Sequence, residues 1–362
     1  MQPVRVLVVD DSALMRKLIP QMLERDASIR VVDTAMDGAF ALSKIEEVKP
    51  DVITLDLEMP RMHGIETLRE ITRRHRIPVI VVSAHTTAGA TTTFKALAMG
   101  ALDFVAKPAG AASAQMDEIA TELISKIKIA AGVIGAAPAI ASLPQNPKRP
   151  RPRITHEPTR IIAIGISTGG PTTLQYVLSQ LPGDFPGSIL VVQHMPEGFT
   201  EMFARRLNDT CAVEVKEARS GDLLAAGRVL ICPGNHHLRL RRMPLGPVVI
   251  LGNEERVNGH RPSVDVLFRC VAREFGPKAI AVLMTGMGDD GADAMAEVKA
   301  AGGLTIAQSA ESCVVFGMPK AAIERGHAER VLSLDGLVSA LQAQCNLGRT
   351  EAASTVAAQP AR

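Results

Sequence analysis

The sequence predicts an α/β protein built from two parallel-sheet domains in series. Short apolar runs alternate with helical patterns from about residue 3 to 125, and again from residue 160 to 345. Strands that are almost wholly apolar are typical of parallel sheets covered by helices on both faces. Between the two series, residues 126–159 are rich in Ala, Pro and basic residues, which indicates an extended linker.

The composition is that of a soluble globular protein, and it argues against several functions. The 362 residues carry a formal net charge of +2, so no strong field draws the chain to nucleic acid or lipid. Aromatic residues make up 3%, too few for stacking surfaces that bind single-stranded nucleic acid. The five cysteines are scattered, which argues against a disulfide framework or a thiolate zinc site. No apolar run is long enough to span a bilayer and no signal-peptide layout is present, so a cytoplasmic location is expected.

The first series begins with a strand at Val4–Val9 and a helix that Ser12 caps. Pro20 lies inside that helical pattern and is expected to kink it. Further strands are predicted at Val52–Leu55, Val79–Val82 and Phe104–Val105.

The second series is again a doubly wound pattern. Its predicted strands are Ile161–Ile166, Ile189–Gln193, Val229–Cys232, Val248–Leu251, Ala279–Leu283 and Leu304–Ala307. Helices are predicted near residues 170–181, 199–207, 264–275, 292–301 and 320–325. Residues 346–362 are rich in Ala, Thr and Gln, and a disordered tail is expected there.

Polar residues follow each of the predicted strands of the first series. Asp10 and Asp11 come after one strand and Asp56 after another. Because the carboxyl ends of parallel strands meet at one edge of the sheet, these carboxylates are expected to converge and to bind Mg²⁺. Ser83 and Lys107 follow two further strands, where their side chains suit phosphoryl oxygens. The ordered set favours phosphoryl transfer onto Asp56 as the nucleophile.

These runs resemble the receiver domain of bacterial response regulators. The resemblance rests on VVDDS at residues 8–12, DLEMP at 56–60, SA at 83–84 and GALDFVAKP at 100–108. It implies a flavodoxin-like fold over residues 3–125 and phosphorylation of Asp56 by a histidine kinase. It also implies that Mg²⁺ is held by Asp11, Asp56 and the backbone carbonyl of Glu58, and that Phe104 is an aromatic switch residue.

A glycine-rich turn joins the strand at 161–166 to the following helix. Its run GISTGGP at residues 165–171 fits Gly-x-Ser-x-Gly, the pattern of a nucleophile elbow. The Ser167 hydroxyl would project beside helix N-terminal amides, which stabilise a developing oxyanion. A turn of this kind also binds nucleotide phosphates, and the motif alone does not decide between these two functions.

Two further strand ends carry the groups that a serine nucleophile needs. His194 follows the strand at 189–193 and is a candidate general base. An acid within MTGMGDDG at residues 284–291 would orient its ring. The order Ser, His, Asp differs from the Ser, Asp, His order of α/β-hydrolases and argues against that fold. His236 and His237 look like a metal pair, but adjacent strand residues point to opposite faces, so a structural role is expected.

The second series resembles the catalytic domain of the chemotaxis protein-glutamate methylesterase (CheB) family. Besides the runs above, the match includes QHMP at 193–196, ARSGD at 218–222, PGNHHL at 233–238, RPSVDVLF at 261–268 and FGMP at 316–319. The resemblance implies Ser167 as nucleophile, His194 as base and Asp290 as the orienting acid. Asp290 is chosen over Asp289 because the family's acid directly precedes the glycine. Thr168 and Met287 are placed near the oxyanion site.

Together the resemblances imply a phosphorylation-activated hydrolase that demethylates glutamate γ-methyl esters of chemotaxis receptors and deamidates receptor glutamines. The implied partners are a histidine kinase as phosphoryl donor and the receptors as substrates, and the esterase reaction needs no cofactor. The domain order suggests that the unphosphorylated first domain covers the catalytic cleft. The alternative is a response regulator whose output domain binds partners without catalysis. Binding to nucleic acid and insertion into a membrane are not expected.

Overall fold

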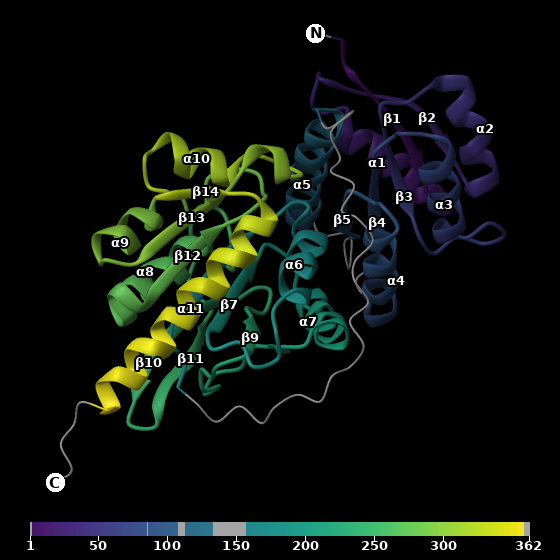
Figure 1. Ribbon diagram of the computed structural model, residues 1–362. Coiled ribbons are helices and arrows are strands. Elements are labelled where there is room, and N and C mark those ends of the chain that lie inside the picture. The colour runs from purple at the N-terminus through teal and green to yellow at the C-terminus, as the bar shows by residue number, and fades with distance from the viewer. Residues whose placement is uncertain (1, 85, 108–112, 133–156, 358–362) are drawn as a thin grey trace. The chain divides into compact units, whose positions relative to one another are not determined.

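A computed structural model describes residues 2–84, 86–107, 113–132 and 157–357 (Figure 1). The chain divides into two compact units, Met1–Ala137 and Pro138–Arg362, and each is described by itself. Most of the linker expected at residues 126–159 lies outside the described residues.

The first unit is a five-stranded parallel sheet with strand order β2-β1-β3-β4-β5. This order is that of the flavodoxin-like fold and confirms the predicted class. The strands are β1 (Val4–Val9), β2 (Ile29–Ala35), β3 (Val52–Asp56), β4 (Val79–Ser83) and β5 (Asp103–Ala106). The helices are α1 (Ala13–Leu23), α2 (Gly38–Val48), α3 (Gly64–Arg74), α4 (Thr87–Ala98) and α5 (Ser113–Gly132).

Three features of the first unit differ from the sequence prediction. Strand β2 was not predicted, because it lies at the sheet edge and its half-exposed residues lack an all-apolar pattern. Helix α1 continues through Pro20, which removes only one backbone hydrogen bond. Helix α5 extends beyond residue 125 to Gly132 because Leu123, Ile127 and Ala130 form a buried stripe at helical spacing. The first unit therefore includes residues 126–132, which had been assigned to the linker.

The second unit contains a seven-stranded, wholly parallel sheet with strand order β14-β13-β12-β6-β7-β9-β8. Its strands are β6 (Ile161–Ile166), β7 (Ser188–Gln193), β8 (Glu214–Glu217), β9 (Arg228–Ile231), β12 (Ala279–Leu283), β13 (Leu304–Gln308) and β14 (Arg330–Leu332). A separate antiparallel hairpin is formed by β10 (His237–Met243) and β11 (Gly246–Gly252).

Helices cover both faces of this sheet (Figure 1). Helix α6 (Gly170–Ser179) packs with both α7 (Phe199–Thr210) and α11 (Leu334–Ala357). A large apolar core lies between the sheet and a second group of elements. These are α8 (Val264–Phe275), α9 (Ala294–Ala300), α10 (Met318–Glu324) and the β10–β11 hairpin. The predicted doubly wound fold is thereby confirmed.

Two predictions for the second unit are wrong. The run Val248–Leu251 is not a strand of the parallel sheet but part of β11 in the hairpin, where Val249 is buried and its neighbours are partly exposed. The tail expected to be disordered from residue 346 is helical as far as Ala357. Its Ala-rich composition favours a helix, and residues 358–362 lie outside the described part.

The strand order changes sides at β6, which is the topological switch point of the sheet. From this central strand the chain first builds β7 on one side, and later returns to build β12 on the other. In open parallel sheets, ligands bind outside the carboxyl ends of the strands at such a switch point. The carboxyl edge of β12, β6 and β7 is therefore where the fold places a functional site.

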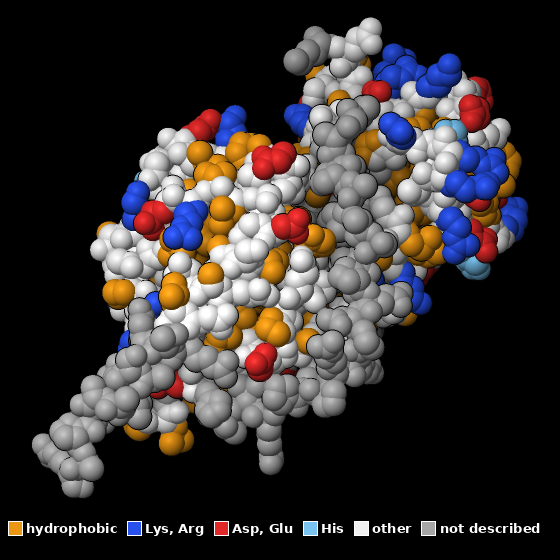
Figure 2. All heavy atoms as spheres, in the orientation of Figure 1, with side chains coloured by type: hydrophobic (Ala, Val, Ile, Leu, Met, Phe, Trp, Pro, Cys, Tyr) orange, Lys and Arg blue, Asp and Glu red, His pale blue; other side chains and the backbone are white. Residues whose placement is uncertain are grey.

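Within the described residues, no helix has both the length and the apolar character needed to cross a membrane. On the face shown in Figure 2, acidic side chains lie among the basic ones on both units and no continuous basic face is visible.

Gly165 allows helix α8 to approach the central strand closely. An added Cβ would lie 2.2 Å from Val264 Cγ1 and 3.0 Å from Leu283 Cδ1. We expect Gly165→Ala to lower the free energy of unfolding of the second unit by about 2 kcal/mol through overpacking.

The matched control is Gly336→Ala in α11, where the nearest atom would be Ser333 Oγ at 3.4 Å. That change should be neutral or stabilising, since Ala favours a helix over Gly. Urea denaturation followed by circular dichroism measures both. Equal stability for Gly165→Ala and wild type would contradict the packing assigned to α8.

Candidate functional site

Three adjacent strands of the second unit deliver a hydroxyl, an imidazole and a carboxylate to one edge of the sheet. Ser167 follows β6 and His194 follows β7, directly after the paired residues Ile166 and Gln193. The His194 amide donates to Ile166 O at 3.1 Å. The Ser167 amide donates to Thr285 O at 2.9 Å, which ties β6 to the loop that leads from β12 to Asp290.

Glycine residues shape the turn that carries Ser167. Gly169 has a φ of +74°, in the left-handed region that glycine adopts readily, and α6 begins directly after it. A Cβ on Gly286 would lie 2.7 Å from Ser167 Cβ, so only glycine lets the β12 loop pass this close. Gln193 Nε2 donates to Ser167 O at 3.0 Å and fixes the turn from the other side.

His194 is held by the carboxylate that the sequence assigned to it. Its Nε2 lies 2.9 Å from Asp290 Oδ2, and its side chain is 9% exposed. Its other ring nitrogen, Nδ1, is buried and has no hydrogen-bond partner. The ring therefore presents an unused acceptor nitrogen beside the turn of Ser167, although no hydrogen bond yet joins it to the hydroxyl. Such bonds are often completed only when substrate binds.

Asp290 is buried and surrounded by hydrogen-bond donors. Its Oδ2 accepts from the Val264 amide at 2.7 Å as well as from His194. Its Oδ1 accepts from Ser263 Oγ at 2.8 Å, Asn258 Nδ2 at 3.1 Å and the Asp265 amide at 3.3 Å. The two amides belong to the first turn of α8, whose dipole also favours a negative charge.

These donors keep the Asp290 carboxylate ionised. Burial by itself would raise the pKa of Asp290, but the His194 ring, the Val264 amide and the Ser263 hydroxyl outweigh it and lower the pKa to about 2. Because the folded-state pKa lies below the unfolded value, the carboxylate contributes about 2 kcal/mol of stability at neutral pH. This contribution is lost as the pH falls from about 5 toward 2.

The neighbouring acid has a different partner. Asp289 Oδ2 lies 2.5 Å from Arg325 Nη2 at the surface, and its side chain is 55% exposed. Of the two acids that the sequence offered, it is Asp290 that contacts His194.

The remaining residues named from the sequence lie in the loops that follow β6, β9 and β12 or at the start of β10. Within the described residues, the Thr168 amide donates to no partner. Thr285 Oγ1 donates to Thr168 O at 3.0 Å. Met287 is exposed on the β12 loop. His236 Nδ1 lies 3.0 Å from Gly234 O, and His237 Nε2 lies 3.0 Å from Glu255 O.

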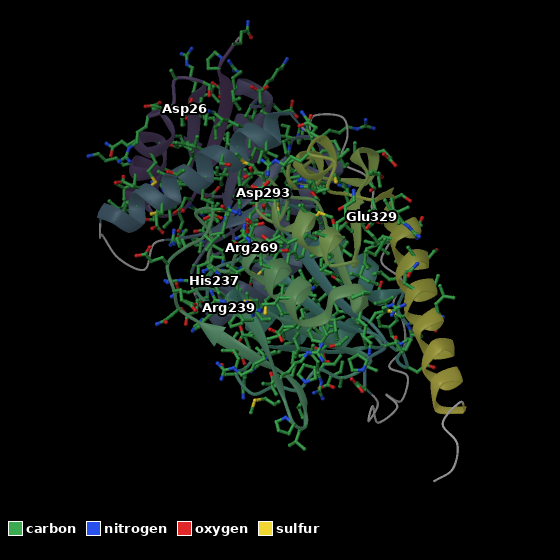
Figure 3. All side chains as sticks on the ribbon, turned by 90° about the vertical axis from the view of Figure 1, so that its left-hand side faces the viewer. Asp26, His237, Arg239, Arg269, Asp293 and Glu329 are labelled. Atoms are coloured by element: carbon green, nitrogen blue, oxygen red, sulfur yellow. The ribbon has the colours of Figure 1, made fainter. Side chains whose placement is uncertain are left out.

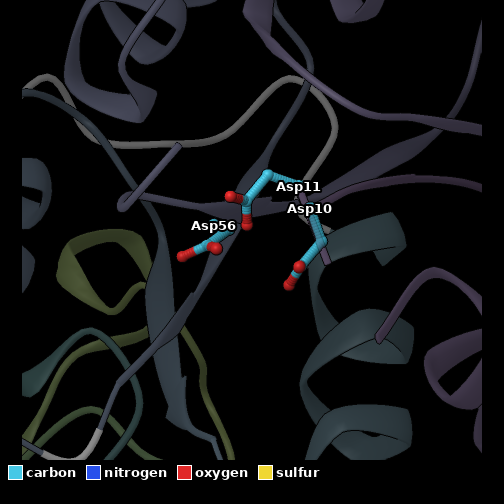
Figure 4. A group of neighbouring side chains, drawn as sticks. All are labelled: Asp10, Asp11 and Asp56. Carbon is cyan, nitrogen blue, oxygen red and sulfur yellow. The ribbon is translucent and has the colours of Figure 1, made fainter. Parts of the chain in front are cut away.

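In the first unit, three carboxylates converge at the carboxyl edge of the sheet (Figure 4). Oxygen atoms of Asp10, Asp11 and Asp56 lie within 4.8 Å of one another. Lys107 Nζ lies 2.7 Å from Asp56 Oδ2 and 2.9 Å from Asp10 Oδ2. The Glu58 amide donates to Asp56 Oδ1 at 3.1 Å, which brings the backbone of Glu58 to the pocket.

The charges of this pocket are only partly balanced. Burial raises the pKa of Asp56, as does the charge of Asp10, while Lys107 opposes the shift. Burial would lower the pKa of Lys107, but its two carboxylate partners raise it above the ordinary value. Asp10 Oδ2 is buried, and Lys107 Nζ, which also contacts Asp56, is its charged partner at 2.9 Å. Three carboxylates facing one ammonium group fit a hard divalent cation, which prefers oxygen ligands.

Two further predicted residues of this unit lie close to the pocket but face other elements. Ser83 is buried; its hydroxyl accepts from Thr93 Oγ1 at 2.6 Å and lies 3.3 Å from Gly89 O, on the side of α4. Phe104 is also buried, with its ring edge-on to Phe94 at a centroid distance of 6.3 Å. Lys126 Nζ lies 5.4 Å from the Phe104 ring centroid.

Comparison with known proteins decides the family. Residues 162–341 match the profile of the CheB methylesterase family, and residues 6–118 match that of the response regulator receiver domain. A curated relative from Koribacter versatilis, named protein-glutamate methylesterase/protein-glutamine glutaminase 2, is 62% identical over 94% of this chain and 96% of its own length. The chain belongs to the CheB methylesterase family.

Other members support the assignment along the whole chain. A protein-glutamate methylesterase/protein-glutamine glutaminase from Symbiobacterium thermophilum is 44% identical over 94% of this chain and 96% of its own length. The crystal structure of the Thermotoga maritima CheB methylesterase catalytic domain is 43% identical and superimposes with a TM-score of 0.50. It covers 51% of this chain and 97% of that domain.

Sequence reasoning missed several residues that hold the CheB triad candidates in place. Asn258 and Ser263 donate to Asp290. Asp265 is buried and accepts from the Gly291 and Ala294 amides, both at 3.1 Å, which fixes the loop that carries Asp290. The Asn-Gly dipeptide at residues 258–259 is a strong tight-turn signal, but no pattern indicated that this turn would reach the active site.

The adjacent acids Asp289 and Asp290 allow a matched test of the site. We expect Asp290→Asn to lower kcat about 10³–10⁴-fold, because the amide cannot hold the imidazole as the carboxylate does. Asp289→Asn removes only the surface pair with Arg325 and should retain wild-type kcat within about twofold, since exposed pairs contribute little. Ester hydrolysis by both full-length variants measures the difference. Equal loss in the two variants would contradict the assignment of Asp290.

Proposed function

We propose that this CheB family member is a phosphorylation-activated hydrolase that removes methyl groups from glutamate γ-methyl esters of chemotaxis receptors. The activity follows from the family, whose curated members are named protein-glutamate methylesterase/protein-glutamine glutaminase. The observation that carries the residue assignment is the 2.9 Å contact between His194 and the buried, ionised Asp290, beside the turn of Ser167.

In the proposed reaction Ser167 Oγ attacks the γ-carbonyl carbon of the ester. His194 Nδ1, the ring nitrogen without a partner, takes the hydroxyl proton. Asp290 holds the ring through Nε2 and stabilises the imidazolium. The carbon–oxygen bond to the methoxy group then breaks, and His194 returns the proton to release methanol. Water, deprotonated by the same imidazole, hydrolyses the acyl-enzyme and regenerates Ser167.

The negative oxygen of the tetrahedral intermediate needs donors close to Ser167. The Thr168 amide is assigned to this role, because it follows the nucleophile, has no partner within the described residues, and lies near the N-terminus of α6. The Ser167 amide is already bonded to Thr285 O and does not serve. The loop that carries Met287 is proposed to line this site, because the neighbouring Gly286 passes close to Ser167.

The same site is proposed to deamidate glutamine side chains of the receptors. Both reactions pass through a tetrahedral oxyanion, and they differ only in whether methanol or ammonia leaves. His194 protonates the leaving group in either case.

The first unit is proposed to accept a phosphoryl group on Asp56 from a histidine kinase. A receiver domain implies Mg²⁺, and Asp11, Asp56 and the backbone carbonyl of Glu58 are proposed to hold it, beside Asp10. The bound ion would neutralise charge on the phosphoryl group. Asp56 attacks phosphorus as the bond to the donor nitrogen breaks, and Lys107 balances the added charge from its position 2.7 Å away. Ser83 must turn from α4 to contact the phosphoryl group.

The two domains are proposed to be connected by the Pro-rich segment and to work in the cytoplasm. In the unphosphorylated protein the receiver would restrict access to the catalytic cleft, and phosphorylation would shift the population toward an accessible arrangement. This regulation is motivated by the domain order alone.

The variant Ser167→Ala distinguishes the proposed hydrolase from the alternative, an output domain that binds partners without catalysis. We expect methanol release from methylated receptor to fall at least 10³-fold, because the nucleophile is removed while the fold is kept. Receptor binding, measured by co-sedimentation with receptor-containing membranes, should stay within about twofold of wild type. Undiminished methanol release from the variant would rule out Ser167 as the nucleophile.

Phosphorylation of Asp56 should raise the methylesterase rate of the full chain. A small phosphoryl donor with Mg²⁺ is expected to increase methanol release about tenfold or more, and either chelation of the metal or Asp56→Asn should abolish the increase. The basal rate without donor serves as the control for each sample. A donor effect that persists in Asp56→Asn would show that another group is phosphorylated.

A further inference from the structure

The turn at Val257–His260 contacts both the acid and the base of the proposed triad. The Val257 amide donates to His260 O at 3.0 Å, and the His260 amide donates to Val257 O at 2.9 Å. The two central residues, Asn258 and Gly259, have φ of +54° and +75°. Two residues with positive φ between a pair of closing hydrogen bonds form the tight turn that Asn-Gly favours.

Asn258 links the two carboxylates at the N-terminus of α8. Its Nδ2 lies 3.1 Å from Asp290 Oδ1 and 2.9 Å from Asp265 Oδ2. An amide nitrogen carries two hydrogens, so it can donate to both acids at once and offset their mutual repulsion. Because Asp265 also fixes the Gly291 and Ala294 amides, Asn258 joins Asp290 to the anchor of its own loop.

His260 covers one face of the proposed general base. Its ring lies parallel to the His194 ring, with a centroid distance of 3.8 Å and an interplanar angle of 5°. The Asp290 contact restrains one edge of the His194 ring, whereas the stack restrains its plane. The two restraints together limit rotation of the imidazole and keep Nδ1 directed to one place.

The segment that carries the turn is itself firmly attached. On one side, Arg261 binds Asn235 Oδ1 through Nε at 3.0 Å and Nη2 at 2.6 Å. The buried His237 holds both sides: its Nε2 donates to Glu255 O before the turn at 3.0 Å, and its Nδ1 accepts from the Ser263 amide after the turn at 3.3 Å. Figure 3 labels His237 at the start of the hairpin, near Arg239.

Packing in the hydrophobic core does not account for this turn. Asn258 and Gly259 are exposed, and a Cβ on Gly259 would meet no atom within 4 Å. Changes at these two positions are therefore not expected to disturb packing. Their contacts lead to Asp290, Asp265 and, through His260, to His194.

We propose that the Val257–His260 turn is a positioning clamp for the base and acid of the methylesterase, with Asn258 aligning Asp290 and His260 aligning His194. Neither residue reaches the reacting atoms in this assignment. The inference deepens the proposed function and rests on it.

The charged groups around the clamp suggest Asn258→Asp as the most informative substitution. Asp265 faces Asn258 and pairs with Arg269 at 3.1 Å, while Asp289, on the loop after β12, is occupied by Arg325. Asn258→Asp is nearly isosteric but places a third carboxylate beside Asp265 and Asp290. The added negative charge favours protonation of both Asp290 and His194.

We expect Asn258→Ala in the full-length enzyme to lower kcat for methanol release about tenfold while KM stays within about twofold, as for loss of one hydrogen bond to a charged group. Asn258→Asp should lower kcat further and move the acidic limb of the kcat–pH profile upward by about one pH unit. A residue that only stabilised the fold would not shift that limb. Thermal unfolding of each variant verifies that the fold is retained.

Paired substitutions test the stack and the turn. His260→Phe keeps an aromatic face and should retain most of kcat, whereas His260→Ala should lose about tenfold. Gly259→Ala strains the turn through its positive φ and should lower kcat. Its matched control is Gly326→Ala, which has a φ of +71° and equally open space but lies after α10.

A spectroscopic measurement separates failure of the clamp from failure of the proposed function. Nitrogen NMR of histidine-labelled full-length protein should show His194 protonated at Nε2 in wild type, and a mixture of tautomers in Asn258→Ala and His260→Ala. If wild type releases no methanol but the NMR change appears, the proposed activity is wrong and the clamp stands. If the variants match wild type in kcat, pH profile and NMR spectrum, the clamp is overturned.

Discussion

The catalytic half of this protein depends on keeping one carboxylate charged inside the fold. An ionised carboxylate is costly to bury unless donors replace the water it loses. The structure gives Asp290 five donors from three segments: the His194 ring, the Asn258 side-chain amide, and, at the start of α8, the Ser263 hydroxyl and two backbone amides. The close packing of α8 on β6, which Gly165 permits, brings those backbone amides to the carboxylate. The packing of α8 on the sheet therefore also determines the charge state of Asp290.

The pKa values of the buried acids are shifted in opposite directions in the two domains, and each shift suits the proposed chemistry. Asp56 has one ammonium partner and two acidic neighbours, so burial raises its pKa and leaves negative charge to be balanced by a cation. Asp290 is saturated with donors, so its pKa is low and it holds an imidazole without being consumed. A nucleophile must remain accessible to a reacting group, whereas an orienting acid is best fully committed to its neighbours. Both sites lie at the carboxyl edge of a parallel sheet, where the fold gathers residues from separate loops.

Much of this arrangement could be predicted from the sequence, because apolar strands end in chemically distinctive residues. Ser167, His194 and Asp10 each follow a clear strand, so their positions at the sheet edge were predictable. Strand β2 was missed because it is half-exposed, and the β10–β11 hairpin was missed because Val248–Leu251 resembles a buried parallel strand. The tail was misjudged because Ala-rich sequence is compatible with both a frayed end and the helix that α11 forms. The contacts of Asn258 and His260 with the triad depend on tertiary structure, and no local pattern encodes them.

The protonation state of Asp290 is the quantity on which the catalytic assignment turns, and carbon NMR of its carboxyl group across a pH titration measures it directly. The account predicts a carboxyl resonance that stays at its ionised position from pH 7 to pH 4 and titrates with a pKa of about 2. A resonance that titrates at or above the ordinary aspartate value would mean that the donors around Asp290 do not hold its charge, and the role given to the His194–Asp290 pair would be wrong.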